Sequence, residues 1–236
     1  MNKYKYETHF HTSEISPCGR VKASEGVRLY HDAGYAGIIV TDHYFEGFFE
    51  TLPAVSWDRK ADLFLEGYRR ASEEGQKLGL DVHPGIELRF NENANDYLIY
   101  GFNESFLKEY KELYTLNLKK FRELTEGMGI IIIQAHPFRQ NMIPADPSLI
   151  DGVEIYNGNP RHNSFNSLAE EYARKNGLKM LSEGRYRCGE QGQSRRFRGC
   201  DPKGQGTGIN TNRLIAGFGF SGSYREHICG IYESGT

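Results

Sequence analysis

The sequence lacks the features that would place it among secreted, membrane or nucleic-acid-binding proteins. Its four cysteines are too few and too irregularly spaced for a disulfide framework or a Cys-x-x-Cys zinc site, so we expect free thiols. It has no run of about 18 apolar residues, and its first residues lack the apolar core of a signal peptide. The formal net charge of −2 provides no general attraction to nucleic acid or acidic membranes. These absences favour a cytoplasmic protein that binds neither nucleic acid nor membrane.

Short apolar runs and amphipathic stretches alternate along most of the chain. The 236 residues are 38% hydrophobic and 25% charged, values typical of one large globular domain. Strands are expected at residues 4–9, 37–41, 81–88, 96–101, 129–134, 152–156 and 178–181. Helices are expected at residues 24–33, 60–78, 106–128 and 164–176. This order predicts an α/β fold with a mainly parallel sheet, built as a barrel or as a doubly wound sheet.

The composition changes abruptly at about residue 183. Residues 183–236 hold 12 of the chain's 27 glycines and three of its four cysteines. One interpretation is a flexible basic tail. The interpretation that we favour is a shifted reading frame that replaced the native sequence, because the change falls where a strand should pass into its loop. We therefore divide the chain into a metallohydrolase domain at residues 1–182 and an atypical segment at residues 183–236.

Histidines and a carboxylate lie where several predicted strands end. His9 and His11 form His-x-His at the end of the first strand, where alternate side chains point to one face. His43 and His136 follow apolar strands, and Glu87 ends another. Because the carboxyl ends of strands in β/α barrels meet on one face, we expect these side chains to share divalent cations.

Four short motifs carry a family resemblance. They are Thr8-His9-Phe10-His11-Thr12, Thr41-Asp42-His43, Gly85-Ile86-Glu87 and Ala135-His136-Pro137. In this order and spacing they resemble the polymerase-and-histidinol-phosphatase (PHP) family of metal-dependent phosphoesterases, over residues 5–182. The resemblance implies a distorted seven-stranded β/α barrel with two or three divalent metal ions, commonly zinc, manganese or iron.

The resemblance also implies a set of metal ligands, from which the sequence departs in places. Residues that match the family's ligands directly are His9, His11, His43, Glu87 and His136. In the first loop, where many members have Asp or His, Cys18 or Glu14 can serve as the metal ligand. A thiolate ligand would favour zinc. The alternative for Cys18 is a small packing residue. Asp96 stands where many members have a histidine, and its alternative is a surface position at a strand start.

The family's last metal-binding motif is absent. After a strand such as residues 178–181 the family usually has Ser-Asp-x-His, whereas Ser182-Glu183-Gly184-Arg185 follows here. The loss falls where the composition changes, which supports the shifted reading frame. We expect this chain to be less active than one with the usual ending.

Other polar residues have candidate roles around the cations. Arg139 lies one turn after His136 and can bind a phosphate with its guanidinium group, or form a surface ion pair. Tyr44 and Asn157 are candidates for lining the pocket, and Glu154 is a candidate for orienting a ligand. The apolar stripe from residue 106 to 124 is interpreted as core. Histidines interpreted as structural or solvent-facing are His31, His83, His162 and His227.

The resulting hypothesis is hydrolysis of a small phosphomonoester, or less favourably a phosphodiester, by metal-activated water. The metals and Arg139 would hold the phosphoryl oxygens, and His43 or His136 can protonate the leaving group if it is free of metal. One alternative is an amidohydrolase-like enzyme, which usually needs a metal-bridging lysine that no predicted strand end offers. Another is a protein that binds metal, or has a regulatory role, without catalysis.

Overall fold

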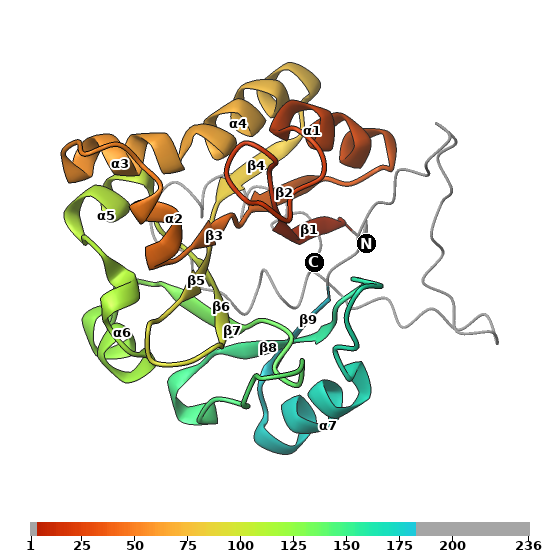
Figure 1. Cartoon of the computed structure of the whole chain (residues 1–236). Coiled ribbons are helices and arrows are strands. Elements are labelled where there is room, and N and C mark those ends of the chain that lie inside the picture. Colours follow the sequence, from red (N-terminus) through yellow and green to blue (C-terminus); the bar gives the residue numbers. More distant parts are fainter. Residues whose placement is uncertain (1–3, 183–236) are drawn as a thin grey trace.

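The computed structural model describes residues 4–182, which form two β-sheets with helices on their outer faces (Figure 1). The first sheet has the strand order β1-β2-β4, and the second has the order β3-β5-β6-β7-β8-β9. The strands are β1 (Tyr6–Phe10), β2 (Gly37–Val40), β3 (His43–Tyr44), β4 (Asp81–Pro84), β5 (Ile86–Arg89), β6 (Asp96–Tyr100), β7 (Ile131–Gln134), β8 (Gly152–Tyr156) and β9 (Lys179–Ser182).

Seven α-helices and two short 3-10 helices connect these strands within the described residues. They are α1 (Ala23–Asp32), α2 (Glu46–Glu50), α3 (Trp57–Phe64), α4 (Glu66–Leu78), α5 (Glu104–Glu109), η1 (Leu113–Thr115), α6 (Leu118–Leu124), η2 (Pro147–Leu149) and α7 (Asn166–Asn176). None of these helices is long and apolar enough to cross a membrane. The atypical segment at residues 183–236, and with it the proposed shift of reading frame, lies outside the described residues.

The first sheet is entirely parallel, and the second is mixed. β6 is antiparallel to both β5 and β7, whereas the other neighbours in the second sheet pair in parallel. Residues 90–95 between β5 and β6 are too few for the crossover that a parallel pair needs. The expected α/β class is confirmed. Among residues 4–182 no strand ladder joins the two sheets into the single seven-stranded barrel that the family resemblance implies.

The chain passes from the first sheet to the second at two places, between β2 and β3 and between β4 and β5. The predicted strand at residues 81–88 is two strands, β4 and β5, divided at Gly85. A Cβ atom on Gly85 would lie 2.9 Å from Ile39 Cγ2 and 3.0 Å from Thr41 Cγ2, so glycine permits the close approach of β2. Thr41 and Asp42 separate β2 from β3. β3 then pairs with β5, which sets His43 directly beside Glu87.

Two of the predicted helices are interrupted. Residues 60–78 belong to α3 and α4, and residues 106–128 to α5, η1 and α6. The side chains of Asn103 and Asn117 accept hydrogen bonds from backbone N–H groups at the starts of α5 and α6, so each helix begins separately. Asn117, which lies inside the predicted helix at residues 106–128, is the local signal in the sequence for the interruption of that helix.

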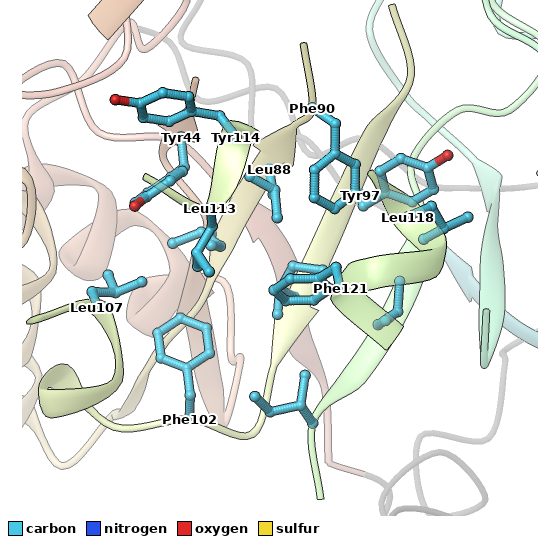
Figure 2. Close-up of a cluster of buried hydrophobic side chains, with 14 of the residues drawn as sticks. Tyr44, Leu88, Phe90, Tyr97, Phe102, Leu107, Leu113, Tyr114, Leu118 and Phe121 are labelled. Carbon is cyan, nitrogen blue, oxygen red and sulfur yellow. The ribbon is translucent and has the colours of Figure 1, made fainter. Parts of the chain in front are cut away.

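The largest apolar core packs the second sheet against α3, α5 and α6 (Figure 2). Aromatic rings dominate it, with Tyr44 and Phe49 in edge contact at 4.7 Å between ring centroids and Phe90 against Phe121 at 5.7 Å. The apolar stripe from residue 106 to 124 contributes to this core, as expected. Tyr44 is fully buried in it, so the expectation that Tyr44 lines the site is wrong. A smaller core joins the first sheet to α1 and α4.

A third apolar cluster draws on both sheets. Its buried members are Leu98, Tyr100, Ile131, Ile133, Ala135 and Leu181, with Ile39 of β2 packed against them. The Tyr100 hydroxyl donates a 2.7 Å hydrogen bond to the carbonyl oxygen of Thr8, which links β6 to β1. The two sheets therefore meet across a filled interior.

Candidate metal centre

The His-x-His segment at the end of β1 places two buried imidazoles side by side. His9 is 4% exposed and His11 is 8% exposed, and their Nε2 atoms lie 3.0 Å apart. Because successive residues of a strand point to opposite faces, Phe10 between them packs in the core beneath α1. Two buried ring nitrogens at this distance need a shared proton or a shared cation.

Glu87 on β5 lies at the centre of four histidines. Its Oε1 atom is 3.2 Å from His9 Nε2 and 3.1 Å from His136 Nε2. Its Oε2 atom is 3.3 Å from His11 Nε2 and 2.7 Å from His43 Nδ1. Oε2 is buried and makes no hydrogen bond of acceptable geometry with any residue that the structure describes. One carboxylate thus presents each oxygen to a different pair of imidazoles and retains acceptor capacity for a cation.

Ligand atoms from separate strand ends gather into three overlapping groups among residues 4–182. The groups are His9, Glu87 and His136; His11, Cys18 and His43; and His43, Glu87 and Asp96. Within each group, one ligand atom from every residue lies within 4.8 Å of the others. The fold therefore brings together all the predicted ligands except Glu14.

The loop after β1 separates the two residues that were candidates for its ligand. The Glu14 carboxylate accepts hydrogen bonds of 3.0 and 3.2 Å from the N–H of Ala23, at the start of α1, where the helix dipole favours negative charge. Cys18 Sγ lies 3.2 Å from His43 Nε2. Glu14 thus serves a helix start, and Cys18 faces the histidines.

Glu154 on β8 supports two of the histidines. Its Oε1 atom lies 2.9 Å from His9 Nδ1, and its Oε2 atom accepts a 2.9 Å hydrogen bond from the backbone N–H of His136. A carboxylate on the second nitrogen of an imidazole sets the tautomer and leaves the first nitrogen for a metal. These contacts agree with the expectation that Glu154 orients a ligand.

Asp42 supports the other two histidines through Ser16. Its carboxylate accepts hydrogen bonds from the Thr12 N–H at 2.8 Å, and from the hydroxyls of Thr12 and Ser16 at 2.7 Å each. Ser16 Oγ accepts a 3.0 Å hydrogen bond from the His43 N–H and lies 3.3 Å from His11 Nδ1. This network was not predicted, although the position of Asp42 within Thr41-Asp42-His43 was a usable signal.

Asp96 begins β6 and is held by Arg89. Its two carboxylate oxygens each accept a 2.8 Å hydrogen bond from the Arg89 guanidinium, and Oδ2 is 4.0 Å from His136 Nε2. Asp96 is 2% exposed, so the alternative interpretation as a surface position is wrong. Burial and the nearby charge of Glu87 raise the pKa of Asp96. The two-pronged contact with Arg89 offsets the cost of burying the charged form.

The loop after β7 carries His136 and Arg139. His136 has a φ of 31°, a conformation uncommon for residues other than glycine and frequent at functional sites. Its Nδ1 atom lies 3.0 Å from Met142 Sδ. Arg139 Nη2 donates to Asn157 Oδ1 at 3.1 Å, and Asn157 Nδ2 donates to Glu154 Oε2 at 3.0 Å. Asn157 therefore connects Arg139 to the carboxylate that supports the histidines.

The buried charges strongly shift one another's protonation. Burial would lower the pKa of His9 and His43. Glu87 and Glu154 together outweigh it at His9, whose pKa lies well above its usual value, and Glu87 and Cys18 together outweigh it at His43, whose pKa is raised to about 10. Burial would raise the pKa of Glu87, but His43 and His9 hold it well below its usual range. At His11 burial dominates and lowers the pKa to about 3. Protons on His9 and His43 thus balance Glu87, and a cation would displace them.

The other histidines of the described residues lie outside the three groups. His31 Nδ1 is 3.2 Å from the Asp32 carboxylate on the surface, and the ring of His83 stacks on Tyr6 at 6.3 Å between centroids. His162 lies in the loop after β8. These positions agree with their interpretation as structural or solvent-facing. His227 lies outside the described residues.

Comparisons with known proteins reveal similarity of fold. No protein-family model and no curated protein matches the sequence. The structure resembles a candidate metal-dependent phosphoesterase from Bifidobacterium adolescentis, with a TM-score of 0.51 and 15% identity over 76% of this chain and 86% of that chain. It also resembles a two-domain protein from Bacteroides vulgatus that contains a predicted PHP-like metal-dependent phosphoesterase. That match has a TM-score of 0.54 and 18% identity, and covers 76% of this chain and 50% of that one.

A third similar structure is an amidohydrolase from Chromobacterium violaceum, solved with bound sulfate and no metal. Its TM-score is 0.52 at 13% identity, over 83% of this chain and 92% of that chain. Similarity at this level of identity establishes the fold. The structural resemblance to PHP-like metal-dependent phosphoesterases is therefore confirmed, and the architecture is shared with this amidohydrolase.

Proposed function

We propose that the protein is a metal-dependent phosphoesterase that hydrolyses a small phosphomonoester. The arrangement around Glu87 carries the proposal, because each of its two oxygens faces two imidazole nitrogens at 2.7 to 3.3 Å. Imidazole and carboxylate donors suit zinc, manganese and iron. The buried Oε2 atom, which lacks a hydrogen bond of acceptable geometry within the described residues, fits a cation. We expect two or three divalent ions, held by the three groups of ligands.

The residues behind the ligands hold the site rigid. A divalent cation, when bound, would supply Lewis acidity towards a phosphoryl oxygen and lower the pKa of a water molecule. Glu154 holds His9 and His136, and Asp42 holds His11 and His43 through Ser16. Because these supports are already in place, the site needs little reorganisation as charge develops on the substrate.

Arg139 is the proposed phosphate-binding residue. A guanidinium group can direct two parallel N–H donors at phosphoryl oxygens, and the contact of Arg139 Nη2 with Asn157 restricts its position. Protonation of the leaving oxygen by His43 or His136 stays a prediction. Both imidazoles lie within groups of potential metal ligands, and either acts as an acid only where it does not bind metal.

The amidohydrolase reaction is the second candidate function, favoured by the fold shared with the Chromobacterium violaceum protein. The metal-bridging lysine that this class usually needs has no counterpart here, since no lysine ends or directly follows a strand among residues 4–182. A third possibility, metal binding without catalysis, predicts the same ligands and no turnover.

The test uses the full chain, reloaded with Mn²⁺ or Zn²⁺, on three chromogenic substrates. We expect hydrolysis of p-nitrophenyl phosphate, slower hydrolysis of bis(p-nitrophenyl) phosphate, and none of p-nitroacetanilide. A chelator should stop the reaction, and returning metal should restore it. Cleavage of the anilide without the phosphate esters would assign the amidohydrolase reaction. Stable metal binding without any hydrolysis would leave a non-catalytic metal protein.

We also propose that residues 1–182 form one metal-binding domain and that its two sheets belong to one distorted barrel. The apolar cluster shared by both sheets and the hydrogen bond from Tyr100 to Thr8 support this. If residues after 182 result from a shifted frame, a chain that encodes Ser-Asp-x-His there should hydrolyse p-nitrophenyl phosphate faster than the present chain. Equal rates would contradict the shifted frame.

A further inference from the structure

His11, Cys18 and His43 gather one sulfur and two imidazoles beside Glu87, an arrangement called here the sulfur site. We propose that the sulfur site binds Zn²⁺ or Co²⁺ through a Cys18 thiolate, in strong preference to Mn²⁺ or Mg²⁺. The inference rests on the proposed function for the presence of metal. It adds that the centre holds two chemically different sites, of which one selects its metal through sulfur.

The backbone defines the position of Cys18. The Gly19 N–H donates a 2.9 Å hydrogen bond to the carbonyl oxygen of Ser16, which closes a turn with Pro17 and Cys18 at its central positions. A Cβ atom on Gly19 would lie 2.4 Å from the carbonyl oxygen of Thr12, so glycine lets the loop fold tightly on itself. Cys18 is therefore presented by a compact turn and not by an extended loop.

His43 is oriented towards Cys18 by Glu87. Its Nδ1 atom lies 2.7 Å from Glu87 Oε2, whereas its Nε2 atom lies 3.2 Å from Cys18 Sγ. An imidazole whose Nδ1 atom faces a carboxylate is held with its Nε2 atom directed elsewhere, here towards Cys18. The ring of His11 stacks on that of His43 at 4.5 Å between centroids, so a second imidazole lies alongside. His43 thus has a support that leaves its Nε2 atom facing Cys18, with His11 alongside.

The distance between the sulfur of Cys18 and the nearest imidazole nitrogen is close to the distance that zinc requires. Zinc–nitrogen bonds of about 2.0–2.1 Å and a zinc–sulfur bond of about 2.3 Å place nitrogen and sulfur about 3.5 Å apart. The distance between His43 Nε2 and Cys18 Sγ is 3.2 Å, and Cys18 is partly exposed, so a small outward movement of the sulfur admits the ion. The thiol proton passes to solvent as the metal–sulfur bond forms.

The neighbouring carboxylate site, defined as His9, Glu87 and His136, differs in its chemistry. It offers only nitrogen and oxygen donors, and all three residues are buried. Thiolate sulfur is a soft ligand that favours zinc and cobalt, whereas manganese and magnesium favour oxygen. The sulfur site should therefore discriminate between these metals more strongly than the carboxylate site.

The test is a Co²⁺ titration of the full chain, followed by absorption spectroscopy. A cobalt–thiolate bond produces a near-ultraviolet charge-transfer band that nitrogen and oxygen ligands do not produce. We expect this band in the wild-type protein and its loss in Cys18→Ser. The matched control replaces Cys188, Cys200 and Cys229 with serine together and should keep the band. Bound cobalt without the band in the wild type, or a band that survives in Cys18→Ser, would overturn the proposal.

A competition experiment tests the selectivity. Cys18→Asp replaces sulfur with oxygen, and we expect the ratio of Zn²⁺ to Mn²⁺ affinity to fall at least tenfold, measured by equilibrium dialysis. An unchanged ratio would contradict a role for sulfur. Melting curves of the metal-free variants establish that they are folded. The two proposals fail separately, since a missing charge-transfer band leaves phosphoester hydrolysis intact, and missing hydrolysis leaves the band intact.

Discussion

The two faces of the second sheet are both buried, but different kinds of side chain cover them. On β5, Leu88 belongs to the large apolar core (Figure 2), as does Ile86. Glu87 between them faces the histidines. On β8, Val153 joins the same core, and Glu154 supports His9. The alternation of side chains along a strand thus separates a face that packs on itself from a face that gathers charge.

This difference shows which part of the molecule needs a ligand. The apolar face is complete, because its aromatic rings contact one another and exclude water. The polar face concentrates four imidazoles around Glu87, whose buried Oε2 atom lacks a well-formed hydrogen bond among the described residues. Burying such groups is costly unless they are paired or bind metal. The apolar face should therefore govern stability, and the polar face should govern metal affinity and catalysis.

The largest expected effect comes from a substitution in the apolar face alone. Phe121 is fully buried against Phe90, and Phe121→Ala should lower the free energy of unfolding by about 3–5 kcal/mol because it leaves a cavity. Urea unfolding of the metal-free protein measures this change. The folded fraction should still bind the wild-type number of metal ions. A loss of metal in that fraction would mean that the two faces are not independent.

The reverse experiment makes a substitution in the polar face alone. Glu87→Gln keeps the shape of the side chain but removes the charge that faces four imidazoles, so metal affinity should fall by at least about 100-fold, as loss of a ligand exceeds loss of a supporting group. Hydrolysis of p-nitrophenyl phosphate should fall with it. Elemental analysis after reloading and desalting measures the metal. Full metal content in Glu87→Gln would remove Glu87 from the centre.

Substitution of Arg139 separates substrate binding from metal binding within the polar face. Arg139→Ala should lower kcat/KM for a phosphoester by roughly tenfold, equivalent to about 1.4 kcal/mol, through loss of a charged contact with phosphate. Metal content should not change. Arg70→Ala is the control, because Arg70 forms an exposed ion pair with Glu66 on α4. Equal kinetics of wild type and Arg139→Ala would place Arg139 outside the substrate contacts.

The last expected effect is a gradual dependence of stability on pH in the metal-free protein, spread over several pH units. The pKa of His43 is raised to about 10, so its protonation stabilises the folded state fully below the unfolded pKa of about 6.5. This contribution should be lost as the pH rises from about 7 to about 10, and bound metal should abolish the dependence by replacing the proton. Urea unfolding of the full chain with a chelator measures it, with Cys18 retained because Cys18 contributes to the raised pKa of His43. An equal decline in His43→Gln would assign the effect elsewhere.

Several features of the site could be predicted because their signals are local. His9 and His11 alternate on one strand, and His43, Glu87 and His136 each follow or end an apolar run. The motifs also indicated the fold that the comparisons confirm. The division of the strand at Gly85 was not predicted, because it depends on how closely another strand approaches. Arg89, Ser16 and Met142 were missed for a similar reason, since nothing in their immediate sequence indicates which side chain they meet.

The α/β class and the positions of the metal-ligand candidates could be predicted from the amino-acid sequence, since hydrophobic period and motif order are properties of neighbouring residues. How these candidates combine depends on the packing of distant segments. Glu87 and His136 are 49 residues apart, and His9 and Glu154 are 145 apart, yet each pair is in direct contact. Contacts of this kind depend on sheet register and on how the two sheets meet. The same packing turned Cys18 towards His43 and placed Glu14 at the start of α1.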